Sequence, residues 1–187
     1  MVTKLQRGLV SILVCCAAAV SFCQTRGGRS IFLLAGENGG WCAFKNERTW
    51  ASAKASMDTV PDVAKVDYLN GQVTFVYVTT ADETGDWTIY DKYVFDKNGQ
   101  PTRLERTINI TDQMREEQTW AIRNNKAVKE RSVGRSLSTH AVIPEGKIWL
   151  PDLPVITRAR EFPFWTLATE RTTELLSKGR ICEPQKE

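Results

Sequence analysis

Histidine is almost absent from this chain, so the side chains that most often carry acid–base and metal chemistry are few. His140 is the only histidine among the 187 residues, and it follows Ser136, Ser138 and Thr139 in a polar stretch. No serine lies in a nucleophile-elbow pattern, and a zinc site would need a second histidine or a closely spaced cysteine pair beyond the first 23 residues. A glycine-rich nucleotide-binding motif is also missing. The sequence therefore predicts no metal and no cofactor.

The chain also lacks an apolar run long enough to cross a membrane. Leu9 to Cys23 is shorter than the roughly 20 residues that a spanning helix needs, and Lys4 and Arg7 precede it. A charged start, a short apolar centre and small residues near its end are typical of a secretory signal peptide. We predict that residues 1–23 are a cleaved signal peptide, that the protein is secreted or periplasmic, and that the mature chain has no transmembrane span. An uncleaved anchor and lipidation at Cys23 are the alternatives.

A large excess of one charge is missing as well. Lys4 and Arg7 are the only charged residues of the signal segment, so the 25 basic side chains of the full chain become 23 against 22 acidic ones. A nearly neutral domain has no global electrostatic attraction for phosphate backbones, and we predict no nucleic-acid partner.

Cysteine is scarce in the predicted mature chain. Cys42 and Cys182 remain after cleavage, with Cys23 as a third if cleavage precedes it. In an oxidising compartment two such cysteines are expected to pair. We therefore predict a disulfide between Cys42 and Cys182, and free thiols or pairing between chains through Cys23 are the alternatives.

Turn residues, by contrast, recur between residues 62 and 134 at nearly regular intervals. The segments between them are rich in β-branched and aromatic residues, and Asn-Gly between such segments is a strong hairpin signal. This spacing predicts six consecutive antiparallel strands. Lys126 to Arg135 is polar enough to be an edge strand that its charges protect. The turns are Asn70-Gly71, Asp82 to Asp86, Asn98-Gly99, Thr111 to Gln113 and Asn124-Asn125.

Tight two-residue turns would fix the register of the hairpins. Around Asn70-Gly71 they place Tyr68 opposite Val73, Val66 opposite Phe75 and Ala64 opposite Tyr77. Around Asn98-Gly99 the predicted opposite pairs on the apolar face are Trp87 with Ile110, Ile89 with Ile108, Asp91 with Arg106, Tyr93 with Leu104 and Phe95 with Thr102.

An apolar face must be covered, and two segments outside the strands have suitable patterns. Glu47 to Met57 carries apolar residues at helical spacing, and Phe164 to Lys178 predicts a C-terminal helix that ends at Gly179. Pro144 to Pro163 reads as a proline-stiffened extended segment across the sheet. We predict an α+β domain over residues 41–187, with about six strands in a meander, and both helices on one face. Residues 24–40 are expected to be a flexible mature N-terminus; a curled sheet approaching a barrel is the alternative.

Asp91 is the least expected residue on that face, because a carboxylate there is costly unless it is paired. Arg106 is the partner that the register supplies, so a buried ion pair is the structural interpretation. A pocket lined by Asp91, Arg106, Tyr93 and Trp87 is the functional one. We expect an exported non-catalytic binding or structural module that engages a protein, an envelope component or a small apolar ligand. The alternative is a secreted or periplasmic hydrolase that uses His140 or carboxylates around Asp91.

Overall fold

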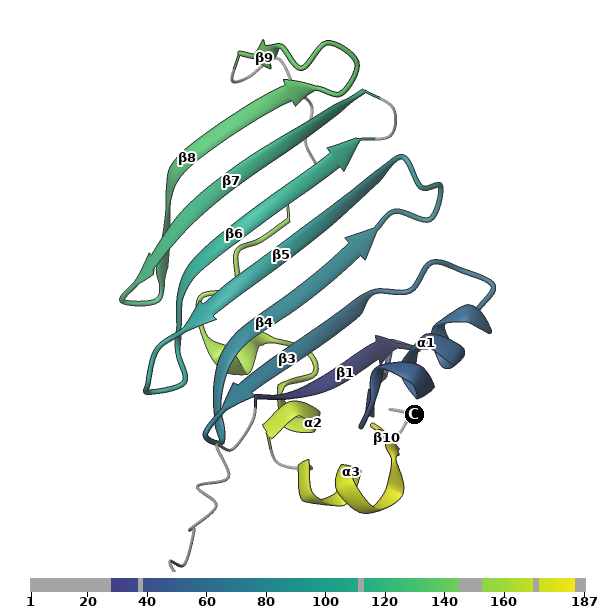
Figure 1. The fold of residues 1–187 in the computed structure, drawn as a ribbon. Helices are drawn as coiled ribbons and strands as arrows, with labels where there is room; N and C mark the ends of the chain where they lie inside the picture. The colour runs from purple at the N-terminus through teal and green to yellow at the C-terminus, as the bar shows by residue number, and fades with distance from the viewer. Residues whose placement is uncertain (1–27, 37–38, 111–112, 145–152, 170–171, 184–187) are drawn as a thin grey trace, which may run out of the picture.

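Across the residues that the structure describes, the fold is an antiparallel sheet of ten strands with the order β10-β2-β1-β3-β4-β5-β6-β7-β8-β9 (Figure 1). The computed structural model describes residues 28–36, 39–110, 113–144, 153–169 and 172–183, so the predicted signal peptide lies outside the described residues. The strands are β1 (Arg29–Ala35), β2 (Trp41–Phe44), β3 (Val63–Leu69), β4 (Gln72–Ala81), β5 (Trp87–Phe95), β6 (Pro101–Ile110), β7 (Met114–Arg123), β8 (Lys126–Ser136), β9 (Val142–Ile143) and β10 (Arg180–Cys182).

Strands β3 to β8 are the six that the turn spacing predicts, but the sheet contains four more. The largest difference is β1, because Arg29–Ala35 falls in the stretch predicted to be flexible and instead pairs with both β2 and β3. Its apolar run is buried on both faces, with Ile31 and Leu33 on one side and Leu34 on the other. Such a strand has no polar alternation, and glycines flank it, so sequence patterns favoured a loop.

The second hairpin keeps its predicted register by combining two irregularities. Asp96 and Gln100 pair across a loop whose Gly99 has a φ of +72°, which makes the turn one residue longer than predicted. A bulge then sets Phe95 opposite Pro101 instead of Thr102. From Val94 back to Trp87 the predicted pairs are confirmed, including Asp91 opposite Arg106. The bulge absorbs the extra turn residue, and the apolar pairs stay matched.

In the first hairpin a bulge at Thr74 changes the predicted register. Asn70 and Gly71 form the expected turn with φ values of +54° and +80°, and Tyr68 pairs with Val73. Beyond the bulge, however, Val66 faces Val76 and Ala64 faces Val78, so the predicted pairs with Phe75 and Tyr77 are wrong. The bulge therefore buries Val76, places Val78 half-buried on the same face and moves Phe75 and Tyr77 to the opposite face.

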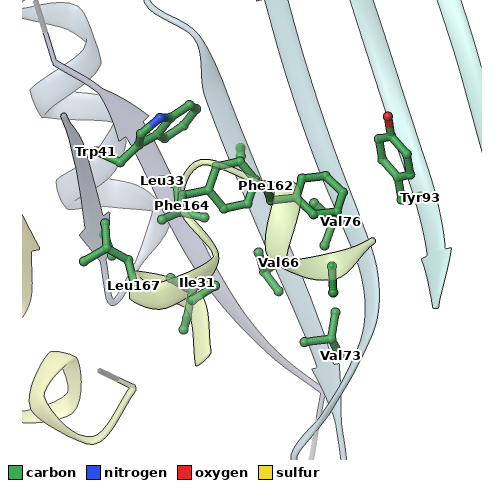
Figure 2. Close-up of a cluster of buried hydrophobic side chains, with 14 of the residues drawn as sticks. Ile31, Leu33, Trp41, Val66, Val73, Val76, Tyr93, Phe162, Phe164 and Leu167 are labelled. Carbon is green, nitrogen blue, oxygen red and sulfur yellow. The ribbon is translucent and has the colours of Figure 1, made fainter. Parts of the chain in front are cut away.

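The two faces of the sheet have different environments. We call the side that packs against residues 153–169 the inner face and the other side the outer face. Figure 2 shows apolar side chains of β1, β3 and β4 around Phe162 and Phe164, which are 2% and 0% exposed. Tyr93 meets the edge of the Phe162 ring at a centroid distance of 5.0 Å. The Tyr68 hydroxyl donates to the carbonyl of Ala168, which holds the C-terminal segment against β3.

The helices lie on opposite faces, not on one face as predicted. Helix α1 (Glu47–Ala55), which Asn46 caps by accepting from the Thr49 amide, packs on the outer face. Its Trp50 Nε1 donates to the Leu33 carbonyl at 3.0 Å, and its apolar side meets Leu34, Phe44 and Val63. The predicted C-terminal helix is two short ones, α2 (Trp165–Thr169) and α3 (Thr172–Lys178), which follow the 3-10 turn η1 (Ala159–Glu161) near the inner face. Both faces of β1 and β2 are apolar, so each needs its own cover.

A disulfide joins Cys42 to Cys182, as the cysteine count predicts. The two residues are opposite each other in the β2–β10 ladder. The bond therefore fastens the C-terminal strand to the start of the sheet. Among the described residues, no helix is both long and apolar enough to cross a membrane.

Reduction of this disulfide should lower stability substantially. The bond closes a loop across 140 positions of sequence, and in the chain-entropy model such a loop contributes about 4 to 5 kcal/mol at most. We expect urea unfolding of the Cys42→Ser, Cys182→Ser double variant to show a free energy lower by that amount. Adding a reductant should reproduce the loss in the wild type and leave the double variant unchanged; an identical midpoint in all samples would contradict the proposed role.

Candidate functional site

The predicted ion pair between Asp91 and Arg106 exists and is buried on the inner face. The Nε of Arg106 donates to Oδ1 of Asp91 at 2.7 Å, and Nη2 donates to Oδ2 at 2.8 Å. Arg106 is 4% exposed and Asp91 9%. Two parallel charge-assisted hydrogen bonds are the strongest geometry for this pair, and they offset part of the cost of burying both charges.

The remaining donors of Arg106 bind the segment that covers the sheet. Nη1 donates to the Leu153 carbonyl at 2.8 Å, and Nη2 also approaches the Pro154 carbonyl at 3.4 Å. Next to them, the Tyr93 hydroxyl accepts the backbone amide of Ile156 at 3.1 Å. We call Asp91, Tyr93 and Arg106 the clamp, because together they fix residues 153–156 to β5 and β6.

Burial and charge both act on the titration of the clamp. Burial raises the pKa of Tyr93 well above its ordinary value, and the negative charge of Asp91 raises it further. Burial alone would lower the pKa of Arg106, but the hydrogen bonds and charge of Asp91 outweigh it and raise that pKa. Tyr93 therefore stays protonated and Arg106 stays charged at physiological pH.

Of the four predicted binding residues, the structure brings Asp91, Arg106 and Tyr93 together. Trp87 lies on the same face of β5, but Ile89 separates it from Asp91 along the strand. The guanidinium of Arg106 is occupied by Asp91 and by two carbonyls, which is the geometry of a structural fastening. Ligand binding by these four residues remains a prediction.

A second buried polar group continues from the clamp across β7 and β8. Glu116 accepts from the Ser132 hydroxyl at 2.5 Å and from the Gln118 amide at 2.8 Å, and the Gln118 oxygen accepts from Trp120 Nε1 at 3.1 Å. The sequence analysis did not single out Glu116 and Gln118. Side chains alternate between the two faces along a strand, and Trp120 and Ile122 point to the inner face. Counting back from them in steps of two places Gln118 and Glu116 on the inner face as well. Every fully buried side-chain polar atom of the described residues has a hydrogen-bond partner.

His140 is exposed in the turn between β8 and β9, where its φ is +59°. Its backbone amide donates to the Ser136 carbonyl, while the Ser136 and Ser138 hydroxyls contact each other at 3.1 Å. Within the described part of the chain, the His140 side chain has no hydrogen-bonded serine or carboxylate. The described ranges also contain no group of three or more His, Cys, Asp or Glu side chains that could hold a metal ion.

The outer face carries a shallow hollow of about 220 Å³. Tyr77, Lys92 and Glu105 form one row across β4, β5 and β6, and Thr79, Tyr90 and Thr107 form the next. Lys92 Nζ lies 3.0 Å from Glu105 Oε2.

Aromatic rings and cations alternate around this hollow. Lys65 lies over the Tyr77 ring at 5.4 Å, and Lys92 lies over the Phe75 ring at 5.2 Å. Tyr90 is 47% exposed. The two tyrosine rings combine apolar area with hydrogen-bonding hydroxyls, a composition that suits recognition of another molecule. The predicted register placed Phe75 and Tyr77 inside, so these two rings were not expected on this surface.

Comparison of the chain with protein-family models, with curated proteins and with solved structures finds no match in any of the three.

Removing one partner of the clamp should be costly. The Asp91→Ala variant leaves the Arg106 charge buried, and we expect its free energy of unfolding to fall by about 3 to 5 kcal/mol in urea denaturation. An Asp91→Leu, Arg106→Met double variant, which removes both charges, should lose less than the single variant. A loss near zero in Asp91→Ala would show that the pair is not buried.

The raised pKa of Tyr93 leads us to expect a loss of stability at alkaline pH. Its pKa is raised in the folded state, so its contribution is complete below about pH 10, the ordinary pKa of tyrosine, and is lost as the pH rises further. The unfolding free energy of the wild type should fall by about 1.4 kcal/mol more per pH unit in this range than that of Tyr93→Phe. Equal slopes in urea titrations of the two proteins would contradict this account.

Proposed function

We propose that this protein is an exported, non-catalytic binding module that receives a partner protein on the outer face of its sheet. The observation that carries the proposal is the contrast between the two faces. In the described part of the chain the inner face packs against the C-terminal segment and its fully buried polar side-chain atoms are satisfied, whereas the outer face of β4 to β6 presents an aromatic hollow to solvent.

The inner face offers little room for a ligand where the described C-terminal segment covers it. Phe162, Phe164 and Leu167 are at most 2% exposed and pack into the space over β1, β3 and β4. The clamp ties the neighbouring residues 153–156 to the sheet through three hydrogen bonds to backbone groups. A small apolar ligand would have to displace packed side chains or break the clamp.

The outer face has the composition of a recognition surface. Tyrosine is favoured in protein interfaces because it buries a large rigid ring and keeps a polar hydroxyl. Tyr77 and Tyr90 lie in adjacent rows, and the Lys92–Glu105 ion pair in the row of Tyr77 offers both signs of charge. Helix α1 covers only the β1–β2 end of this face.

Export is supported by the signal-like N-terminus and by the disulfide. Structural disulfides persist in oxidising compartments and are rare where thiols are kept reduced. The hydrolase alternative gains no support at His140, whose side chain is exposed and lacks a catalytic partner among the described residues.

A site-specific cross-linking experiment tests the proposal. A photoreactive phenylalanine analogue at Tyr90 should capture one discrete protein when the full chain is expressed in its own host. The same analogue at Arg48, an exposed position on α1, is the matched control and should not give that adduct. Native mass spectrometry of the protein purified from the same cells should show no bound small molecule.

A substitution of Lys92, which lies in the hollow with Tyr90, gives a second test. Lys92→Glu breaks the ion pair with Glu105 at the surface, so stability should change by less than about 1 kcal/mol while the Tyr90 adduct becomes several-fold weaker. Equal adducts at Tyr90 and Arg48, or a retained apolar small molecule in the native spectrum, would contradict a protein partner on the outer face.

A further inference from the structure

In the part of the chain that the structure describes, one edge of the sheet is open along most of β8. The strand runs from Lys126 to Ser136, but β9 pairs only with its last part, at Gly134 and Arg135. Among the described residues, no strand pairs with positions 126–133 on the side away from β7. This stretch extends for about 25 Å, at roughly 3.3 Å per residue, and its backbone can accept another strand.

The direction of the free amides follows from the pairs at both ends of β8. Asn124 and Asn125, with φ values of +52° and +58°, form a two-residue turn that directs the Lys126 amide to Arg123 on β7. The next amide, that of Ala127, therefore points away from β7, and so does that of Lys129. At the other end, Ser136 donates to Ala141 on the β9 side, so the Ser132 amide points the same way.

Four exposed outer-face side chains at this edge are basic and have no acidic partner among the described residues; Glu130, also exposed, is the one acidic residue of β8. Lys126, Arg131 and Arg135 of β8 and Arg123 of β7 are all exposed on the outer face. No carboxylate of the described residues lies within ion-pair distance of these four cations, whereas Arg115 nearby is paired with Glu117. Val128, which is 63% exposed, lies between Lys126 and Arg131. We call this combination of free backbone, four cations and Val128 the β8 edge.

Three kinds of occupant can be compared by their chemistry. A second copy of this chain that paired through β8 would bring cations against cations, which is unfavourable. A phosphate polymer or an anionic membrane would satisfy the cations but could not continue the backbone ladder. An extended peptide rich in Asp or Glu satisfies both the ladder and the charges, and its apolar residues can contact Val128.

We propose that the β8 edge binds an acidic extended segment of the partner protein by strand addition. This inference rests on the proposed function, because it names the segment by which the partner on the outer face is recognised. The segment becomes an eleventh strand, and its carboxylates meet Arg123, Lys126, Arg131 and Arg135 on the outer face.

A peptide experiment tests strand addition directly. The probe is a synthetic peptide that alternates Glu with Val, and its counterpart with Lys in place of Glu is the control. We expect the acidic peptide to bind the full chain, to bind more weakly as salt increases, and to slow the hydrogen exchange of the Ala127, Lys129 and Ser132 amides. The Lys peptide should not bind. Absence of binding by the acidic peptide, or binding without protection of these amides, would overturn the inference.

Two variants separate the backbone from the charges. Arg131→Glu should weaken binding of the acidic peptide by about tenfold or more, and Arg48→Glu, an equal charge change on α1, should leave it unchanged. Ala127→Pro removes a free edge amide and should abolish binding. This variant is informative only if its circular dichroism spectrum and melting curve match those of the wild type. If it does not fold, Arg131→Glu alone tests the inference. Anionic phosphatidylglycerol vesicles that bind as tightly as the peptide through Arg131 would also overturn strand addition.

The two proposals fail in different ways. If Tyr90 cross-links a partner protein with equal yield in the wild type and in Arg131→Glu, while the acidic peptide does not bind, strand addition is wrong and the binding module stands. If Tyr90 captures no protein, the binding module itself is wrong, whatever the peptide does.

Discussion

The contact between Arg106 and the cover of the sheet is the interaction on which the rest of the structure depends. A large sheet with an apolar face cannot remain open to water on that face, and here the cover comes from the far end of the chain. The single side chain of Arg106 attaches the covering segment to the sheet, because its guanidinium binds Asp91 on β5 and the carbonyls of Leu153 and Pro154 at once. The disulfide between Cys42 and Cys182 fixes the chain again beyond the cover.

The covered inner face and the exposed outer face differ in the side chains that they can offer to another molecule. With the polar groups of the clamp and of Glu116 engaged, the described inner face retains few groups with which to recognise another molecule. The bulge at Thr74 has the opposite effect on the outer face, because it turns Phe75 and Tyr77 toward solvent. In the proposed function, the exposed tyrosines and the cations of the outer face are the groups that contact the partner protein.

Much of the sheet could be predicted from the sequence, because turn residues and alternating side chains are local signals. The spacing of Asn70-Gly71 and Asn98-Gly99 gives the strands, and hydrophobic matching places Asp91 opposite Arg106. Bulges could not be predicted, since the extra residue at Thr74 has no signature of its own and its effect on Phe75 and Tyr77 depends on what packs inside. Strand β1 was missed for a related reason: a strand that is buried on both faces shows no alternation. The outer surface therefore could not be read from the chain alone.

The face assignment is the central claim, and hydroxyl-radical footprinting with mass spectrometry tests it most directly. In the purified protein Tyr90 should be oxidised readily and Tyr93, which is 1% exposed, should not. In the complex isolated from the host, Tyr90 should become protected and Tyr93 should stay unreactive. A reactive Tyr93 in the free protein, or protection that spares Tyr90 and appears only on the inner face, would contradict the account.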